Sequence, residues 1–228
     1  EQALGRVADS SLLHVCNRNE LSRWFRARGE TTLASIVRPA MPADFASTDD
    51  LRQFMRSAVA LAREEKHRGE IADFRRDRFD PAYPFLVIGK GSLGGKGRGL
   101  AFLFHQLSRE KGPGIEGIRL RVPTTLVIAT GEFDAFLAEN QLDPAALWRL
   151  GDEEIRRIFR AARLPARLEG DLRAYVEKVA HPLAVRSSSL LEDSHHRPCA
   201  GLYSTYFLSN AHPEAAVRLS QLREAVAL

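Results

Sequence analysis

The feature that most constrains the fold is a glycine cluster between an apolar run and an amphipathic run. Residues 85–88 read Phe-Leu-Val-Ile, the pattern of a short buried strand, and residues 89–99 read GKGSLGGKGRG. Apolar residues then recur at helical spacing from Leu100 to about Lys111. The sequence therefore predicts a strand, a glycine loop and a helix in that order, which is the arrangement of many phosphate-binding sites.

A glycine loop of this kind suits an anion. Without a Cβ atom, backbone N–H groups can approach phosphate oxygens closely, and the start of the following helix adds a positive dipole end. Lys96 supplies a point charge for the same anion. The chain has 33 Lys and Arg against 29 Asp and Glu, and its positive excess lies in residues 81–128. A net charge of +4 is too small to indicate a nucleic-acid-binding protein.

Two common nucleotide-binding patterns fit this loop poorly. The Walker A pattern requires glycine at position 90 and Ser or Thr after the lysine, where this chain has Lys90 and Gly97. Residues 89–94 satisfy G-x-G-x-x-G, but dinucleotide binding also needs an acid at the end of the second strand, and Glu110 follows the helix instead. A Rossmann-type dinucleotide-binding domain and a glycine turn that binds no ligand stay as alternatives.

A second candidate site follows another apolar run. The expected strand at residues 183–185 delivers Arg186 at its end, and three serines follow. A guanidinium group binds two phosphate oxygens at once, and serine hydroxyls add neutral donors. Glu192 and Asp193 come next, and they are candidates either for a metal site or for pairing with Arg186.

We expect two regions of different character. Residues 1–80 show amphipathic helical patterns, including a helix from a Ser47 cap to about Arg68. The charged residues 73–83, with Pro81 and the following Pro84, indicate a linker or a surface-crossing loop. Residues 81–228 alternate strand and helix patterns, which predicts an α/β (α+β) region. Its further expected elements are a strand over 120–129, helices after Thr130 and over 143–179, and a β-rich run over 202–208.

Three motifs in a fixed order resemble one known family. The sequence from about residue 84 to 210 is similar to the nucleotide-binding domain of phosphoenolpyruvate synthase and pyruvate phosphate dikinase. The motifs are Gly94-Gly95-Lys96-Gly97-x-Gly99-Leu100, then Val185-Arg186-Ser187-Ser188-x-x-x-Glu192-Asp193, then Ala200-Gly201-x-x-x-Thr205.

The resemblance implies the first lobe of an ATP-grasp type nucleotide-binding domain. It implies that ATP binds with Mg²⁺, that Lys96 and Arg186 contact the phosphates, and that Gly201 and Thr205 lie on a loop covering them. With the motif positions around them, the expected phosphate-binding residues are Gly94, Gly95, Lys96, Gly97, Arg186, Ser187, Ser188, Gly201 and Thr205. Glu192 and Asp193 are the candidate metal ligands.

The same resemblance implies partners outside this chain. In the family, the phosphoryl group passes from ATP to a histidine on a swivelling domain, and a barrel domain binds pyruvate or phosphoenolpyruvate. We expect residues 81–228 to be an incomplete ATP-binding lobe, with the second lobe, the histidine domain and the barrel missing. A non-catalytic scaffold or regulatory module, with the helices of residues 1–80 binding a partner, is the alternative.

Composition sets the expected location. No apolar run approaches the roughly 20 residues that span a bilayer, and the N-terminal residues carry no secretion signal. Cys16 and Cys199 match neither a metal motif nor a disulfide framework, so both are expected to be reduced thiols. The sequence thus predicts a cytoplasmic protein with ATP as ligand and with neither nucleic acid nor membrane as partner.

Overall fold

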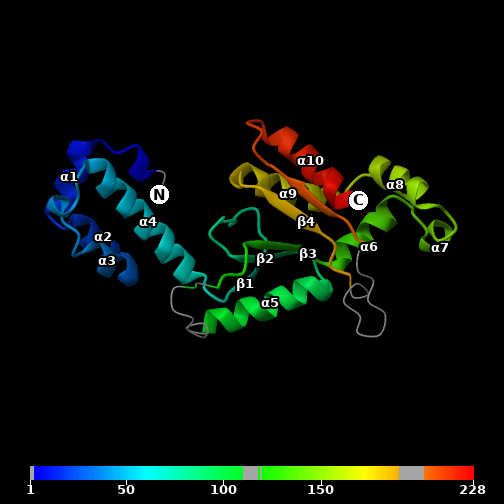
Figure 1. Ribbon diagram of the computed structural model, residues 1–228, viewed down its shortest axis with the longest axis horizontal. Helices are drawn as coiled ribbons and strands as arrows, with labels where there is room; N and C mark the ends of the chain where they lie inside the picture. The colour runs from blue at the N-terminus through cyan, green and yellow to red at the C-terminus, as the bar shows by residue number, and fades with distance from the viewer. Residues whose placement is uncertain (1–2, 110–117, 119, 190–202) are drawn as a thin grey trace. The chain divides into compact units, whose positions relative to one another are not determined.

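The computed structural model describes residues 3–109, 118, 120–189 and 203–228 (Figure 1). The chain divides into two compact units, Glu1–Arg68 and Gly69–Leu228. No helix in the described part of the chain is both long and apolar enough to span a membrane.

The first unit is made of helices around a small apolar core. Leu12, Leu51 and Met55 are buried in it, as is the free thiol of Cys16. The longest helix begins as expected, because the Ser47 hydroxyl accepts a hydrogen bond from the backbone N–H of Asp50 at 3.1 Å. The elements are η1 (Ala3–Gly5), α1 (Asp9–Asn17), α2 (Glu20–Ala27), α3 (Thr31–Val37), η2 (Pro42–Asp44) and α4 (Thr48–Lys66).

The second unit contains a parallel three-stranded sheet in the order β1-β2-β3. Its strands are β1 (Ile71–Asp73), β2 (Phe85–Ile88) and β3 (Thr125–Ile128), and helix α5 (Gly94–Arg109) connects β2 to β3 (Figure 1). Strand β3 is shorter than the expected strand over 120–129, because it begins only after Pro123, which lacks a backbone donor. The predicted order of strand, glycine segment and helix is confirmed.

A second sheet pairs β4 (Leu183–Arg186) with β5 (Thr205–Leu208) in antiparallel orientation. The helices expected after Thr130 and over 143–179 are present, and a further helix ends the chain. They are α6 (Thr130–Glu139), α7 (Pro144–Leu147), α8 (Asp152–Ala161), α9 (Ala166–Lys178) and α10 (Ala215–Ala227). The mixture of helices with parallel and antiparallel strands is the α/β (α+β) fold that the sequence predicts.

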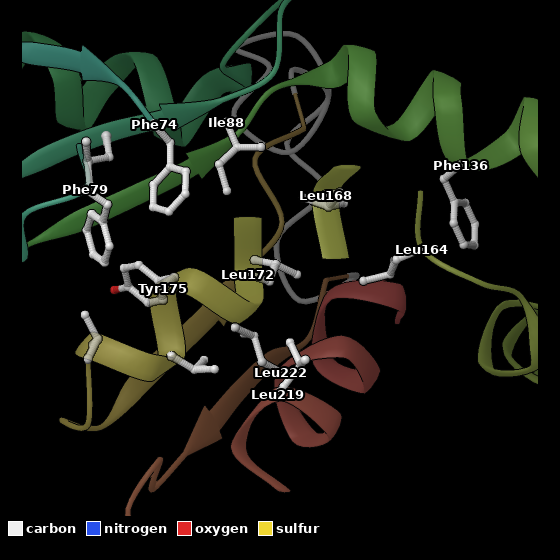
Figure 2. Close-up of a cluster of buried hydrophobic side chains, with 13 residues drawn as sticks. Phe74, Phe79, Ile88, Phe136, Leu164, Leu168, Leu172, Tyr175, Leu219 and Leu222 are labelled. Atoms are coloured by element: carbon white, nitrogen blue, oxygen red, sulfur yellow. The ribbon is translucent and has the colours of Figure 1, made fainter. Parts of the chain in front are cut away.

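The main core of this unit lies between β2, α9 and α10 (Figure 2). Phe74 and Phe79 are buried in it, with ring centroids 4.9 Å apart, and Phe79 stacks on Tyr175 at 5.7 Å. Lys178 of α9 donates to the Phe79 carbonyl oxygen at 2.6 Å. The segment 73–83, expected as a linker, is therefore packed into the second unit, and the boundary between units falls earlier, after Arg68. Burial of its aromatic rings outweighs its charge and its prolines.

Candidate functional site

The connection from β2 to α5 is shaped by glycines that no other residue can replace without strain. Gly89, Gly91 and Gly94 have φ angles of 81°, 107° and 71°, in the left-handed region. A Cβ atom on Gly91 would lie 2.6 Å from the Thr130 hydroxyl oxygen, and one on Gly89 would lie 2.5 Å from a carboxylate oxygen of Glu132. The loop is thus pressed against the start of α6.

Thr130 and Gly131 hold this loop in place. The Thr130 hydroxyl accepts a hydrogen bond from the Ser92 N–H at 3.0 Å, while the Thr130 N–H donates to the Ser92 carbonyl, also at 3.0 Å. The Gly131 N–H donates to the Lys90 carbonyl oxygen at 2.9 Å. Thr130 is the first residue of α6, whose capping position belongs to Ala129, and the Thr130 hydroxyl binds the glycine loop.

Helix α5 begins at Gly94, six residues before its expected start at Leu100. Gly95, Lys96 and Gly97 therefore form its first turn and are not part of a free loop. Glycine is a poor helix former, so the sequence alone favours a longer loop. The first N–H groups of any helix lack partners within the helix, and an external acceptor is needed to stabilise such an early start.

Ser188 is that acceptor. Its carbonyl oxygen accepts from the Gly95 N–H at 3.1 Å, and its hydroxyl oxygen accepts from the Gly97 N–H at 2.8 Å while donating to the Leu93 carbonyl at 2.7 Å. The approach is so close that a Cβ on Gly94 would lie 1.4 Å from the Ser188 carbonyl oxygen. We call these contacts of Ser188 with Leu93, Gly94, Gly95 and Gly97 the serine clasp.

The serine clasp brings the two predicted cationic residues to one place. Lys96 lies between the two glycines that bind Ser188, and Arg186 precedes Ser188 by two residues, so about 7 Å at most separates the Arg186 and Ser188 Cα atoms. Lys96 is partly buried and Arg186 is exposed at the end of β4. Lys96 and Arg186, which are 90 positions apart in the sequence, are thus each within two residues of a contact of the serine clasp.

Strand β5 adds Thr205 to this edge. Arg186 and Thr205 are directly opposite each other in the β4–β5 pair. Side chains at opposed positions of antiparallel strands lie on the same face, within about 5.5 Å at Cβ. Of the other predicted site residues, Ser187 is partly buried beside the clasp, whereas Gly201, Glu192 and Asp193 fall outside the described residues.

An ion pair between a buried glutamate and an exposed arginine, next to the loop, was not anticipated from the sequence. The Glu132 side chain is 8% exposed, packs against Gly89 and pairs with Arg167 of α9. The hydrogen bond from Arg167 and the negative charge of Glu132 raise the pKa of the Arg167 guanidinium above its usual value. Beside it, Arg76 pairs with Asp171 at 2.6 Å. The partners are far apart in the sequence, so no local pattern reveals them.

The described residues do not form a metal centre. No cluster of three or more His, Cys, Asp or Glu side chains with ligand geometry occurs among residues 3–109, 118, 120–189 and 203–228. Mg²⁺ prefers several oxygen ligands, including carboxylates. The described residues around Arg186 and Lys96 do not provide such a set of ligands.

Comparison with known families gives one match. The family model described as pyruvate phosphate dikinase, AMP/ATP-binding domain, matches residues 90–226, which is more than half of the chain and includes Lys96, Arg186 and Thr205. Comparisons with curated proteins and with solved structures give no match. The matched range begins inside the glycine segment and ends in α10. It therefore covers the serine clasp and the strands β3, β4 and β5. The chain belongs to the pyruvate phosphate dikinase family by its AMP/ATP-binding domain.

Proposed function

We propose that this protein binds the phosphates of ATP between Lys96 and Arg186. It would act as the ATP-binding part of a phosphotransferase like phosphoenolpyruvate synthase or pyruvate phosphate dikinase. The serine clasp is the observation that carries the proposal, because it holds the start of α5 and the end of β4 in contact. Both side chains carry a positive charge, and opposite charges attract, so a polyphosphate is a suitable ligand for this part of the unit.

Because of the serine clasp, we assign its residues a different role from the phosphate binding that the sequence predicts. The N–H groups of Gly95 and Gly97 donate to Ser188, and the Ser188 hydroxyl donates to Leu93. We therefore assign Gly94, Gly95, Gly97 and Ser188 to positioning, and the phosphate contacts to the side chains of Lys96 and Arg186. Thr205 lies opposite Arg186 and is placed to donate its hydroxyl to the same phosphates, with Ser187 and Gly201 as further contacts.

Charge and position suffice for this part of the reaction. Phosphoryl transfer depends mainly on holding the phosphate chain in line and stabilising its negative charge. Lys96 acts as a point charge, and the planar Arg186 guanidinium binds two oxygens at once. The acceptor in the proposal is a histidine on a separate domain, with pyruvate or another small molecule as the final substrate. Mg²⁺ neutralises phosphate charge when bound, and Glu192 and Asp193 are this chain's candidate ligands for it.

The test is an isothermal titration of the protein with ATP, ADP and NAD in the presence of magnesium. We expect ATP and ADP to bind, NAD to bind more weakly, and Lys96→Ala to weaken ATP binding by more than about tenfold, or about 1.4 kcal/mol. Arg149→Ala is the matched control, because Arg149 is an exposed arginine in the loop after α7 and its loss changes the net charge equally. Equal effects of the two substitutions would contradict the proposal. No nucleotide binding at all would favour the scaffold alternative.

A further inference from the structure

The outer face of the β4–β5 pair carries an exposed aromatic ring. Leu183, Val185 and Leu208 face the main core of the unit. Because side chains alternate along a strand, the neighbouring residues face the other way. That outer face carries Ala184, Arg186, Thr205 and Phe207.

Phe207 is 81% exposed on this face, which is unusual for a phenylalanine in a strand. Its cross-strand partner is Ala184, whose methyl group is too small to cover a ring. Other exposed aromatic side chains of the described residues lie elsewhere: Trp24 is in the first unit, Phe102 and Phe133 are on helices, and Trp148 follows α7. Phe207 is thus the large exposed aromatic residue that shares a face with Arg186.

The register fixes where the ring lies relative to the proposed phosphate site. Arg186 is opposite Thr205, so Phe207 is its diagonal neighbour, with the two residues about 7–8 Å apart. Phe207 lies on the side of Arg186 away from the serine clasp, because β4 runs toward the clasp and Ala184 precedes Arg186. A ligand with a phosphate at Arg186 that extends along the strands away from the serine clasp would have its next group over Ala184 and Phe207.

We propose that Phe207 is the surface on which the adenine ring of ATP stacks. This inference rests on the proposed function, since it takes the phosphates to be at Lys96 and Arg186. In ATP the ribose lies between the adenine ring and the phosphates. Phe207 and Arg186 are likewise separated along the strands, so the ring and the phosphates can each reach one of them. Aromatic side chains stack on any nucleobase through their π-faces, so Phe207 contributes affinity for nucleotides over phosphate alone.

The test compares ATP with inorganic tripolyphosphate, which has the phosphates but neither base nor sugar. Phe207→Ala is expected to weaken ATP binding by about 5- to 100-fold, the range found for loss of base stacking, and to leave tripolyphosphate binding within about twofold. Phe207→Trp keeps a stacking surface and is expected to retain ATP affinity. Trp148→Ala is the matched control, since Trp148 is 88% exposed in the same unit, and it is expected to change neither affinity.

Two results would overturn the inference alone. One is unchanged ATP binding by Phe207→Ala, and the other is an equal loss of ATP and tripolyphosphate binding, which would indicate a general disturbance of the strands. Circular dichroism melting of each variant checks that the fold is intact, which the exposure of Phe207 leads us to expect. Failure of the unsubstituted protein to bind ATP, or an unaffected ATP affinity in Lys96→Ala, would instead overturn the proposed function and this inference with it.

Discussion

Replacing Gly94 by alanine should break the serine clasp. The new Cβ would lie 1.4 Å from the Ser188 carbonyl oxygen, and Cβ atoms essentially never approach other atoms closer than 3.0 Å. The start of α5 and the segment after β4 must therefore separate by about 1.6 Å or more, the difference between these two distances. That separation lengthens the 3.1 Å bond from Gly95 and the 2.8 Å bond from Gly97 beyond hydrogen-bonding range.

The expected cost has two parts. Two hydrogen bonds contribute about 0.5–1.5 kcal/mol each, and a left-handed backbone costs a residue other than glycine about 1–2 kcal/mol. The free energy of unfolding of the second unit should fall by about 2–5 kcal/mol. For a unit of this size, the loss lowers Tm by about 4–20 °C. ATP affinity should fall as well, because Lys96 and Arg186 are no longer held together.

Gly99→Ala is the matched control for Gly94→Ala. Gly99 is in the same helix, but a Cβ there meets no atom within 4 Å. Alanine is a better helix former than glycine by about 1 kcal/mol, so this variant should be as stable as the unsubstituted protein or slightly more so. The measurements are thermal unfolding and ATP titration of both variants. Equal stability and equal affinity of the two variants would refute the reasoning.

Three further predictions concern the supporting structure. Glu132→Gln removes the charge of a buried carboxylate that pairs with the exposed Arg167, and it should lower the free energy of unfolding by about 1–3 kcal/mol in urea titrations. An unchanged free energy of unfolding would contradict this prediction. Burial raises the pKa of the Cys16 thiol, so the folded state favours the protonated form; in a Cys199→Ser background, stability should fall as pH rises above about 9, and Cys16→Ala should make that fall smaller. Phe85 is fully buried in β2, and Phe85→Ala should cost about 3–5 kcal/mol in the same urea assay; a loss below 1 kcal/mol would show that its site is not packed as described.

Local signals in the sequence predicted elements of both units. The apolar run of β2 and the Ser47 cap each act within a few residues, and both are present. The start of α5 was placed too late, because its stability comes from Ser188, which lies 94 positions beyond Gly94. The segment 73–83 was misread for a similar reason, since the packing of Phe79 on Tyr175 is a tertiary contact.

The sequence likewise predicts only part of the candidate site. Residue type and motif order predict that Lys96 and Arg186 bind the same anion, and this stays a prediction. They could not show that the Gly95 and Gly97 amides donate to Ser188, because hydrogen-bond partners depend on which segments meet in space. The buried pair of Glu132 and Arg167 was missed because a glutamate at the start of a helix is usually exposed and needs no partner.

The central claim is that Lys96 and Arg186 bind the same phosphate chain. A double-mutant cycle tests it directly, with ATP dissociation constants measured for the unsubstituted protein, Lys96→Ala, Arg186→Ala and the double variant. We predict that each single substitution weakens binding by more than about tenfold and that the two effects are non-additive by at least about 0.5 kcal/mol, as for residues that share a partner. Additive effects, or single variants that bind ATP as tightly as the unsubstituted protein, would contradict the claim.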